Sequence, residues 1–189
     1  MKKFLFFLFP LFLTGCMALQ ADPALLRGTE SNTTPLLPND YTVTATLTPE
    51  LASQMSAENL DNLVQQSTDY AIREANIFAN KGNGTYIIHA HVTQASQAMF
   101  GAGRFNGKLE INYQVKDPNN SIVFEKSYYT EAGSDRWYFA AQKRHTRSRI
   151  VNVSKNVNQF VKDFNQYLKE KTTTKKSTKT KSKTKKKSK

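Results

Sequence analysis

The chain has 189 residues and a formal net charge of +12, with 27 basic residues, 15 acidic residues and a single cysteine. One cysteine excludes a fold held by intramolecular disulfides, so the stability must come from a hydrophobic core. Nine lysines lie in residues 172–189 and two in residues 1–15, which leaves a nearly neutral body and argues against a nucleic-acid-binding domain.

Residues 1–15 have the composition of an export signal. Lys2 and Lys3 precede an apolar stretch at residues 4–13, and small residues then lead to Cys16. The apolar stretch is about ten residues long, whereas a helix that crosses a bilayer needs about 20. The segment is therefore predicted to direct export and to be removed, not to span a membrane.

The order Leu13-Thr14-Gly15-Cys16 resembles the lipobox of bacterial lipoproteins. This resemblance implies cleavage between Gly15 and Cys16, a diacylglycerol on the Cys16 thiol and an acyl chain such as palmitate on the new amine. Two or more acyl chains anchor a protein stably to a membrane. Because Met17 and not aspartate follows Cys16, the resemblance also implies the outer membrane, with the protein facing the periplasm. An ordinary secretory signal that ends near a cysteine is the alternative.

Residues 16–40 are predicted to form a flexible tether. They contain Pro23, Pro35 and Pro38, and they show no sustained apolar period. The ends of such a coil would lie roughly 25–30 Å apart. This length would hold the folded domain just off the membrane.

Residues 41–170 are predicted to form one globular domain. The apolar periods indicate, in order, a strand at 41–48, a helix from 56 to about 80, strands at 86–92, 109–116 and 122–130, and a long helix from 150. The order β-α-β-β-β-α predicts an α+β two-layer sandwich, with a four-stranded, mainly antiparallel sheet and two helices on one face. A turn is expected at residues 117–120. The last helix is predicted to expose a polar face that carries Asn152, Lys155, Asn158, Lys162 and Asn165.

The sequence contains no pattern that predicts catalysis or a cofactor. His89 and His91 lie on one face of a strand and could share a metal, but no third ligand is near them in the sequence. Glu131, Asp135 and His145 are not spaced as an acid–base set. We therefore expect no metal, no cofactor and no enzymatic activity.

A basic and aromatic segment precedes the last helix. Its candidate binding residues are Arg136, Trp137, Lys143, Arg144, Arg147 and Arg149. One interpretation is a solvated start of the helix whose aromatic residues fill the core. The other is a contact surface for an anionic glycan, a lipid headgroup or a partner protein, because arginine and aromatic residues are enriched in interfaces.

Residues 171–189 are predicted to be a disordered tail, because they combine like charges with Thr and Ser and lack apolar residues. Its lysines are Lys175, Lys176, Lys179, Lys181, Lys183, Lys185, Lys186, Lys187 and Lys189. The tail either keeps the protein soluble or contacts lipopolysaccharide, phospholipid or peptidoglycan. Such contacts would weaken as salt rises.

The anchor, the small α+β domain and the Arg-rich approach to a terminal helix resemble small Gram-negative envelope lipoproteins. This resemblance implies a non-enzymatic binding or assembly accessory with an envelope protein as partner. Two alternatives stay open: an enzyme that acts on envelope lipid or glycan, and a surface-exposed lipoprotein that binds host molecules.

Overall fold

The structure is a computed structural model that describes residues 19–27, 30–54, 59–97, 106–135 and 141–185, with side chains up to residue 172. The described elements are α1 (Pro23–Leu26), β1 (Asp40–Leu47), α2 (Pro49–Ala52), α3 (Leu60–Glu74), β2 (Thr85–Gln97), β3 (Gly107–Lys116), β4 (Ile122–Ala132) and α4 (Ala141–Lys185). Among these residues, no helix is both long enough and apolar enough to cross a membrane.

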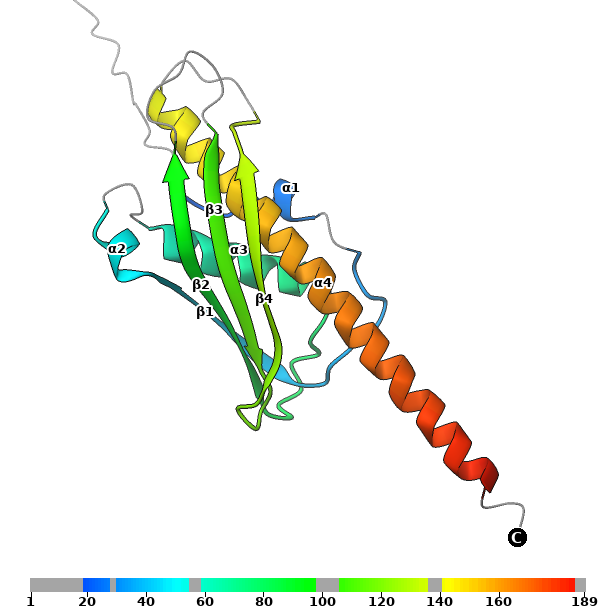
Figure 1. Cartoon of the computed structure of the whole chain (residues 1–189). Helices are drawn as coiled ribbons and strands as arrows, with labels where there is room; N and C mark the ends of the chain where they lie inside the picture. The colour runs from blue at the N-terminus through cyan, green and yellow to red at the C-terminus, as the bar shows by residue number, and fades with distance from the viewer. Residues whose placement is uncertain (1–18, 28–29, 55–58, 98–105, 136–140, 186–189) are drawn as a thin grey trace, which may run out of the picture.

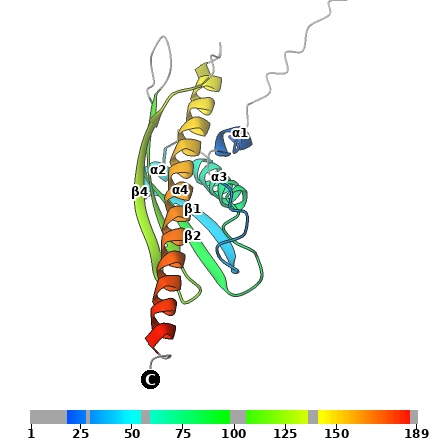
Figure 2. The ribbon, with the colours of Figure 1, turned by 90° about the vertical axis from the view of Figure 1, so that its right-hand side faces the viewer.

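The strands form one sheet in the order β1-β2-β3-β4. β1 runs parallel to β2, and the other neighbours are antiparallel. Parallel neighbours need a crossover, and α3 provides it. Both α3 and α4 cover the same face of the sheet (Figures 1 and 2). The predicted α+β class, the two layers and the order of the main elements are therefore confirmed.

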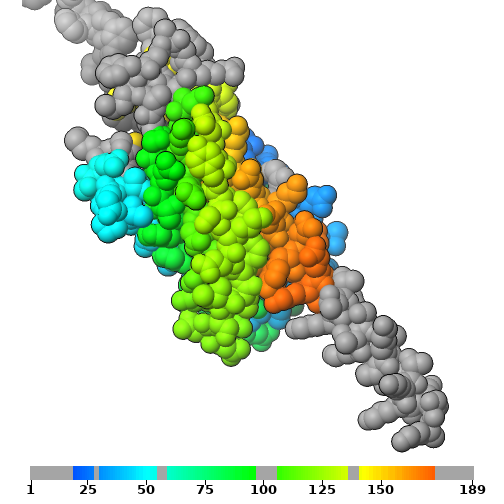
Figure 3. Space-filling model, viewed as in Figure 1, coloured from blue at the N-terminus to red at the C-terminus, as the bar shows by residue number. Residues whose placement is uncertain are grey.

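The core lies between β3 and α4. Alternate residues of β3 are buried, as a strand with one solvated face requires, and they include Leu109, Ile111, Tyr113 and Val115. The ring of Tyr113 stacks on that of Phe160, with the centroids 4.1 Å apart and the planes within 3°. The opposite face of the sheet is open, and Figure 3 views it with β2, β3 and β4 side by side and α4 flanking β4.

The predicted turn between β3 and β4 is confirmed. Oδ1 of Asp117 accepts hydrogen bonds from the backbone N–H groups of Asn119 and Ser121, at 2.9 and 3.0 Å. Asn120 adopts a φ of 62°, a left-handed conformation that asparagine tolerates well. Side-chain and backbone chemistry of the turn residues therefore fix the register of the hairpin.

The first long helix is shorter than predicted. α3 ends at Glu74, and Asn76 follows with a φ of 48°. This left-handed residue stops the helix, and the predicted start at residue 56 lies outside the described residues. The carbonyl of Ile77 then accepts hydrogen bonds from the N–H groups of Leu36 and Leu37, both at 3.0 Å. Residues after the helix therefore pair with the N-terminal part of the chain.

The prediction of a flexible tether is wrong from Leu19 onward. We call residues 19–27 and 30–39 the N-terminal segment. Its Leu26 is fully buried, and Leu19, Ala21 and Leu25 pack against the core. α1 contacts both α3 and α4 on the side away from the sheet (Figure 2). The segment docks because two helices leave a surface that its apolar side chains can cover.

The predicted polar face of α4 is partly wrong. Lys155 and Lys162 are exposed, but Asn152 and Asn165 are buried. Nδ2 of Asn158 donates to the carbonyl of Leu25 at 2.7 Å, and Nδ2 of Asn165 donates to the carbonyl of Glu30 at 3.4 Å. These asparagines satisfy backbone carbonyls of the N-terminal segment.

The C-terminal end also differs from its prediction. The sequence predicts disorder from residue 171, whereas the backbone of α4 continues as a helix to Lys185. Lysine is a good helix former, and extending an existing helix avoids the cost of nucleation.

The upper pole as candidate functional site

The end of β2, the start of β3, the end of β4 and the start of α4 lie together, and we call this end of the domain the upper pole. The pairing places Gln97 opposite Gly107, and Gly107 opposite Ala132. α4 begins at the same end, at the top of Figures 1 and 2. The last helix then runs toward the opposite end of the domain.

Arg147 joins three parts of the chain at the upper pole. Its Nε and Nη2 donate to Oδ1 and Oδ2 of Asp135, both at 2.6 Å. Its Nη1 donates to Oδ2 of Asp22 in the N-terminal segment. Its side chain is only 6% exposed, and the hydrogen bonds that it donates to Asp135 and Asp22 raise its pKa despite the opposing effect of burial. We call this group the Arg147 clamp.

Asp22 has two functions in the clamp. It pairs with Arg147, and its Oδ1 caps α1 by accepting a hydrogen bond from the N–H of Ala24 at 3.0 Å. The sequence pattern predicts Arg147 in a binding patch. In the structure Arg147 instead stabilises the fold, because its guanidinium group is paired with two carboxylates.

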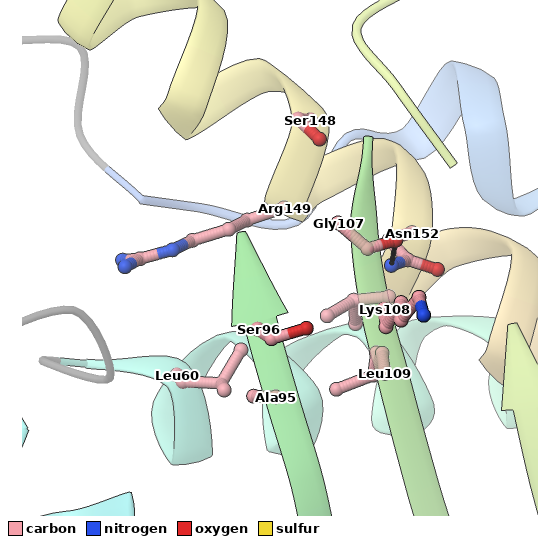
Figure 4. Close-up of a pocket in the computed structure, with 10 residues that line it drawn as sticks. Leu60, Ala95, Ser96, Gly107, Lys108, Leu109, Ser148, Arg149 and Asn152 are labelled. Carbon is pink, nitrogen blue, oxygen red and sulfur yellow. Dashed lines mark hydrogen bonds between the residues drawn. The ribbon is translucent and has the colours of Figure 1, made fainter. Parts of the chain in front are cut away.

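A pocket lies between the first residue of α3, the end of β2, the start of β3 and α4 (Figure 4). It encloses about 380 Å³, including the part that is open to solvent. Four apolar residues line it, which are Leu60, Ala95, Leu109 and Val153. Its polar lining consists of Ser96, Lys108, Ser148, Arg149 and Asn152.

Two of the polar lining residues form hydrogen bonds with backbone carbonyls of the domain. Oγ of Ser148 donates to the carbonyl of Ala132 at 3.1 Å, and Nδ2 of Asn152 donates to the carbonyl of Gly107 at 2.7 Å. The charged lining residues are Lys108 and Arg149, and Figure 4 shows them on different sides of the pocket. Among its described lining residues there is no carboxylate, histidine or cysteine. This composition suits an apolar group next to an anion better than acid–base chemistry.

The other described patch residues lie near the start of α4. Lys143 is exposed, while Arg144 and Arg149 are half-buried. Burial and the nearby guanidinium groups of Arg149 and Arg144 lower the pKa of His145, because both disfavour the charged imidazolium form. Arg136 and Trp137 lie outside the described residues. Of the three described patch residues, Arg149 lines the pocket, and it does so together with Lys108, which is not among the residues that the sequence pattern predicts.

The two strand histidines make hydrogen bonds with threonines of β1. Nδ1 of His89 lies 2.9 Å from Oγ1 of Thr44, and Nδ1 of His91 lies 2.8 Å from Oγ1 of Thr46. Burial, together with the nearby charges of His91 and Lys116, lowers the pKa of His89. In the described part of the chain, no three His, Cys, Asp or Glu side chains are grouped so that they could hold a metal.

The remaining sites of the sequence analysis lie beyond the described side chains. Gly15 and Cys16 precede the first described residue, Leu19. The tail lysines from Lys175 to Lys185 belong to the backbone of α4, and the other three lie after its end.

The fold is similar to those of several solved proteins. A Xanthomonas campestris protein described by the family model DUF330 matches with a TM-score of 0.54 and 9% identity, over 77% of this chain and 94% of that chain. An uncharacterised protein matches with a TM-score of 0.50 and 10% identity, over 72% of this chain and 99% of its own. A minor lipoprotein from Acinetobacter baumannii has a TM-score of 0.40 and 12% identity, over 66% and 92% of the two chains. No family model matches the sequence, and no curated protein matches it. The first two similarities show a shared fold and nothing more.

Proposed function

We propose that the protein is a lipid-anchored lipoprotein of the Gram-negative envelope that acts as a non-enzymatic binding or assembly accessory. The lipobox that ends at Cys16 carries this proposal. We place the protein at the outer membrane, facing the periplasm, because Met17 and not aspartate follows the cysteine.

The pocket at the upper pole supports binding over catalysis. Its floor is apolar, its charged residues are Lys108 and Arg149, and its described lining offers no group that could act as a general acid or base near pH 7. An envelope ligand that places an apolar group beside an anionic group, such as a phospholipid, would match this lining. The protein would then bind this ligand without changing it chemically.

The lysine tail is proposed as a second contact. α4 begins at the upper pole with Ala141, and a helix rises about 1.5 Å per residue, so Lys175 lies about 50 Å along the helix from that start. The tail therefore leaves the domain at the end opposite the Arg147 clamp (Figure 1). We propose that its lysines contact anionic envelope material on that side of the domain, which is peptidoglycan when the upper pole faces the outer membrane.

Replacing Cys16 tests the anchor. The variant Cys16→Ser is expected to lose labelling by radioactive palmitate and to move from the membrane fraction to the soluble fraction, because a hydroxyl does not receive the diacylglycerol. Met17→Ser changes the next residue and keeps the cysteine, so this control should be labelled like the natural protein. Palmitate labelling of the Cys16→Ser variant at the natural level would reject the lipoprotein assignment.

A further inference from the structure

We infer that the upper pole lies against the membrane that holds Cys16, and that Lys108, Lys143, Arg144 and Arg149 contact the phosphates of its phospholipid headgroups. This inference rests on the proposed function, because it requires that Cys16 is acylated.

Only a short length of chain separates the anchor from the fold. Leu19 is half-buried against the core, and it is the third residue after Cys16. Three residues span at most about 10 Å. The predicted tether of 25 residues is thereby reduced to a link too short to hold the domain away from the headgroups.

This short link joins the domain at the upper pole. Asp22 is held by Arg147, six residues into α4, and Arg147 also holds Asp135 just after β4. The Arg147 clamp therefore fixes the N-terminal segment at the upper pole. Because the acyl chains and the start of α4 are both tied to this end, the upper pole must face the bilayer.

The surface that this orientation presents to the membrane carries four basic residues. Lys108 is exposed at the start of β3, Lys143 is exposed in the first turn of α4, and Arg144 and Arg149 are half-buried in the first three turns of α4. Asp22 and Asp135 form ion pairs with Arg147. Glu131 lies opposite Lys108 in the β3–β4 pairing. The surface is therefore cationic overall. Lysine and arginine side chains close to an anionic membrane are attracted to it, and this attraction fades within a Debye length.

The experiment measures which end of the full-length, lipidated protein lies near the headgroups. Two variants, Gln142→Cys and Asn119→Cys, place an exposed thiol at the upper pole and at the β3–β4 turn respectively. β3 has ten residues, so its two ends lie about 33 Å apart. Each protein is labelled with a fluorophore and reconstituted in vesicles of phosphatidylethanolamine and phosphatidylglycerol that contain a headgroup-linked nitroxide quencher.

We expect the label at residue 142 to be quenched several-fold more than the label at residue 119. The double variant Lys108→Glu/Lys143→Glu should reduce the quenching at residue 142, because it reverses two charges that face the phosphates. The matched control Lys81→Glu/Lys116→Glu reverses two charges at the opposite end and should leave the quenching unchanged.

Equal quenching at the two positions, or stronger quenching at residue 119, in protein that still floats with the vesicles would overturn the inference and leave the lipoprotein assignment intact. Quenching at residue 142 that the Lys108→Glu/Lys143→Glu variant does not change would overturn the headgroup contact. Two labels per chain and no flotation would show a free Cys16 thiol, and this result would overturn the assignment and the inference together.

Discussion

Replacing Arg147 with alanine is expected to lower the free energy of unfolding by about 2–4 kcal/mol. The side chain of Arg147 is 6% exposed, and those of its partners Asp22 and Asp135 are 22% and 34% exposed. Removing one partner of a buried ion pair leaves charge without compensation, which costs about 3–5 kcal/mol in the deepest cases. Partial exposure of the two carboxylates reduces this cost.

The Arg147→Ala variant should lose local structure in the N-terminal segment as well as global stability. Without the Arg147 clamp, the repulsion between Asp22 and Asp135 and the loss of the hydrogen bonds should release the N-terminal segment. Urea unfolding measures the free energy, and limited proteolysis detects the released segment as early cleavage before residue 40. Lys143→Ala removes an exposed charge from the same helix and should change stability by less than about 0.5 kcal/mol. An Arg147→Ala variant as stable as this control would show that the clamp does not hold the segment.

Replacing Phe160 with alanine should have the largest effect on the core, about 3–5 kcal/mol. Phe160 is fully buried, and its ring stacks on Tyr113 and lies 5.9 Å from that of Phe164. The edge of Tyr128 completes its surroundings, with ring centroids 6.5 Å apart. Removing the Phe160 ring opens a cavity where α4 meets β3, and the rigid aromatic neighbours cannot move to fill it.

Since domains of this size are stable by only about 5–15 kcal/mol, the Phe160→Ala variant is measured together with the milder Phe160→Leu. Thermal and urea unfolding should rank the natural protein first, Phe160→Leu second and Phe160→Ala last. Ile122→Ala is the control, because Ile122 is 52% exposed and its truncation should change stability by less than about 0.5 kcal/mol. A loss at Phe160 as small as the loss at Ile122 would mean that α4 does not pack on the sheet as described.

The sequence predicts the sheet well where one face is buried and the other is solvated. β3 alternates strictly between apolar and polar residues, and its apolar set is the buried set. The turn that begins at Asp117 carries its own hydrogen-bonding group, so it could also be predicted. Both features depend on neighbouring residues, which a sequence pattern contains directly.

The errors arise where distant parts of the chain meet. Asn158 and Asn165 look like surface residues of a helix, and only the docked N-terminal segment gives them carbonyls to bind. The segment itself has no periodic pattern, because its helix α1 has only four residues. The sequence carries one weak local signal for α1. Asp22 followed by Pro23 is typical of the start of a helix, and α1 begins at Pro23.

The candidate site was predictable only in part. Cys16 and the basic residues around Lys143 are visible in the sequence, since they cluster along the chain. Sequence position could not separate Arg147 from Arg149, although the first is held by two carboxylates and the second lines the pocket. Lys108 joins the site through the pairing of β3 with its neighbours, which depends on the tertiary fold.

Intact mass spectrometry of the mature protein, purified from its native membrane, tests the central claim most directly. The account predicts a chain that begins at Cys16 and carries a diacylglyceryl group on the thiol and an acyl chain on the amine. A chain that begins at another residue, or a Cys16 with a free thiol, would contradict the lipid anchor and the membrane-facing upper pole that depends on it.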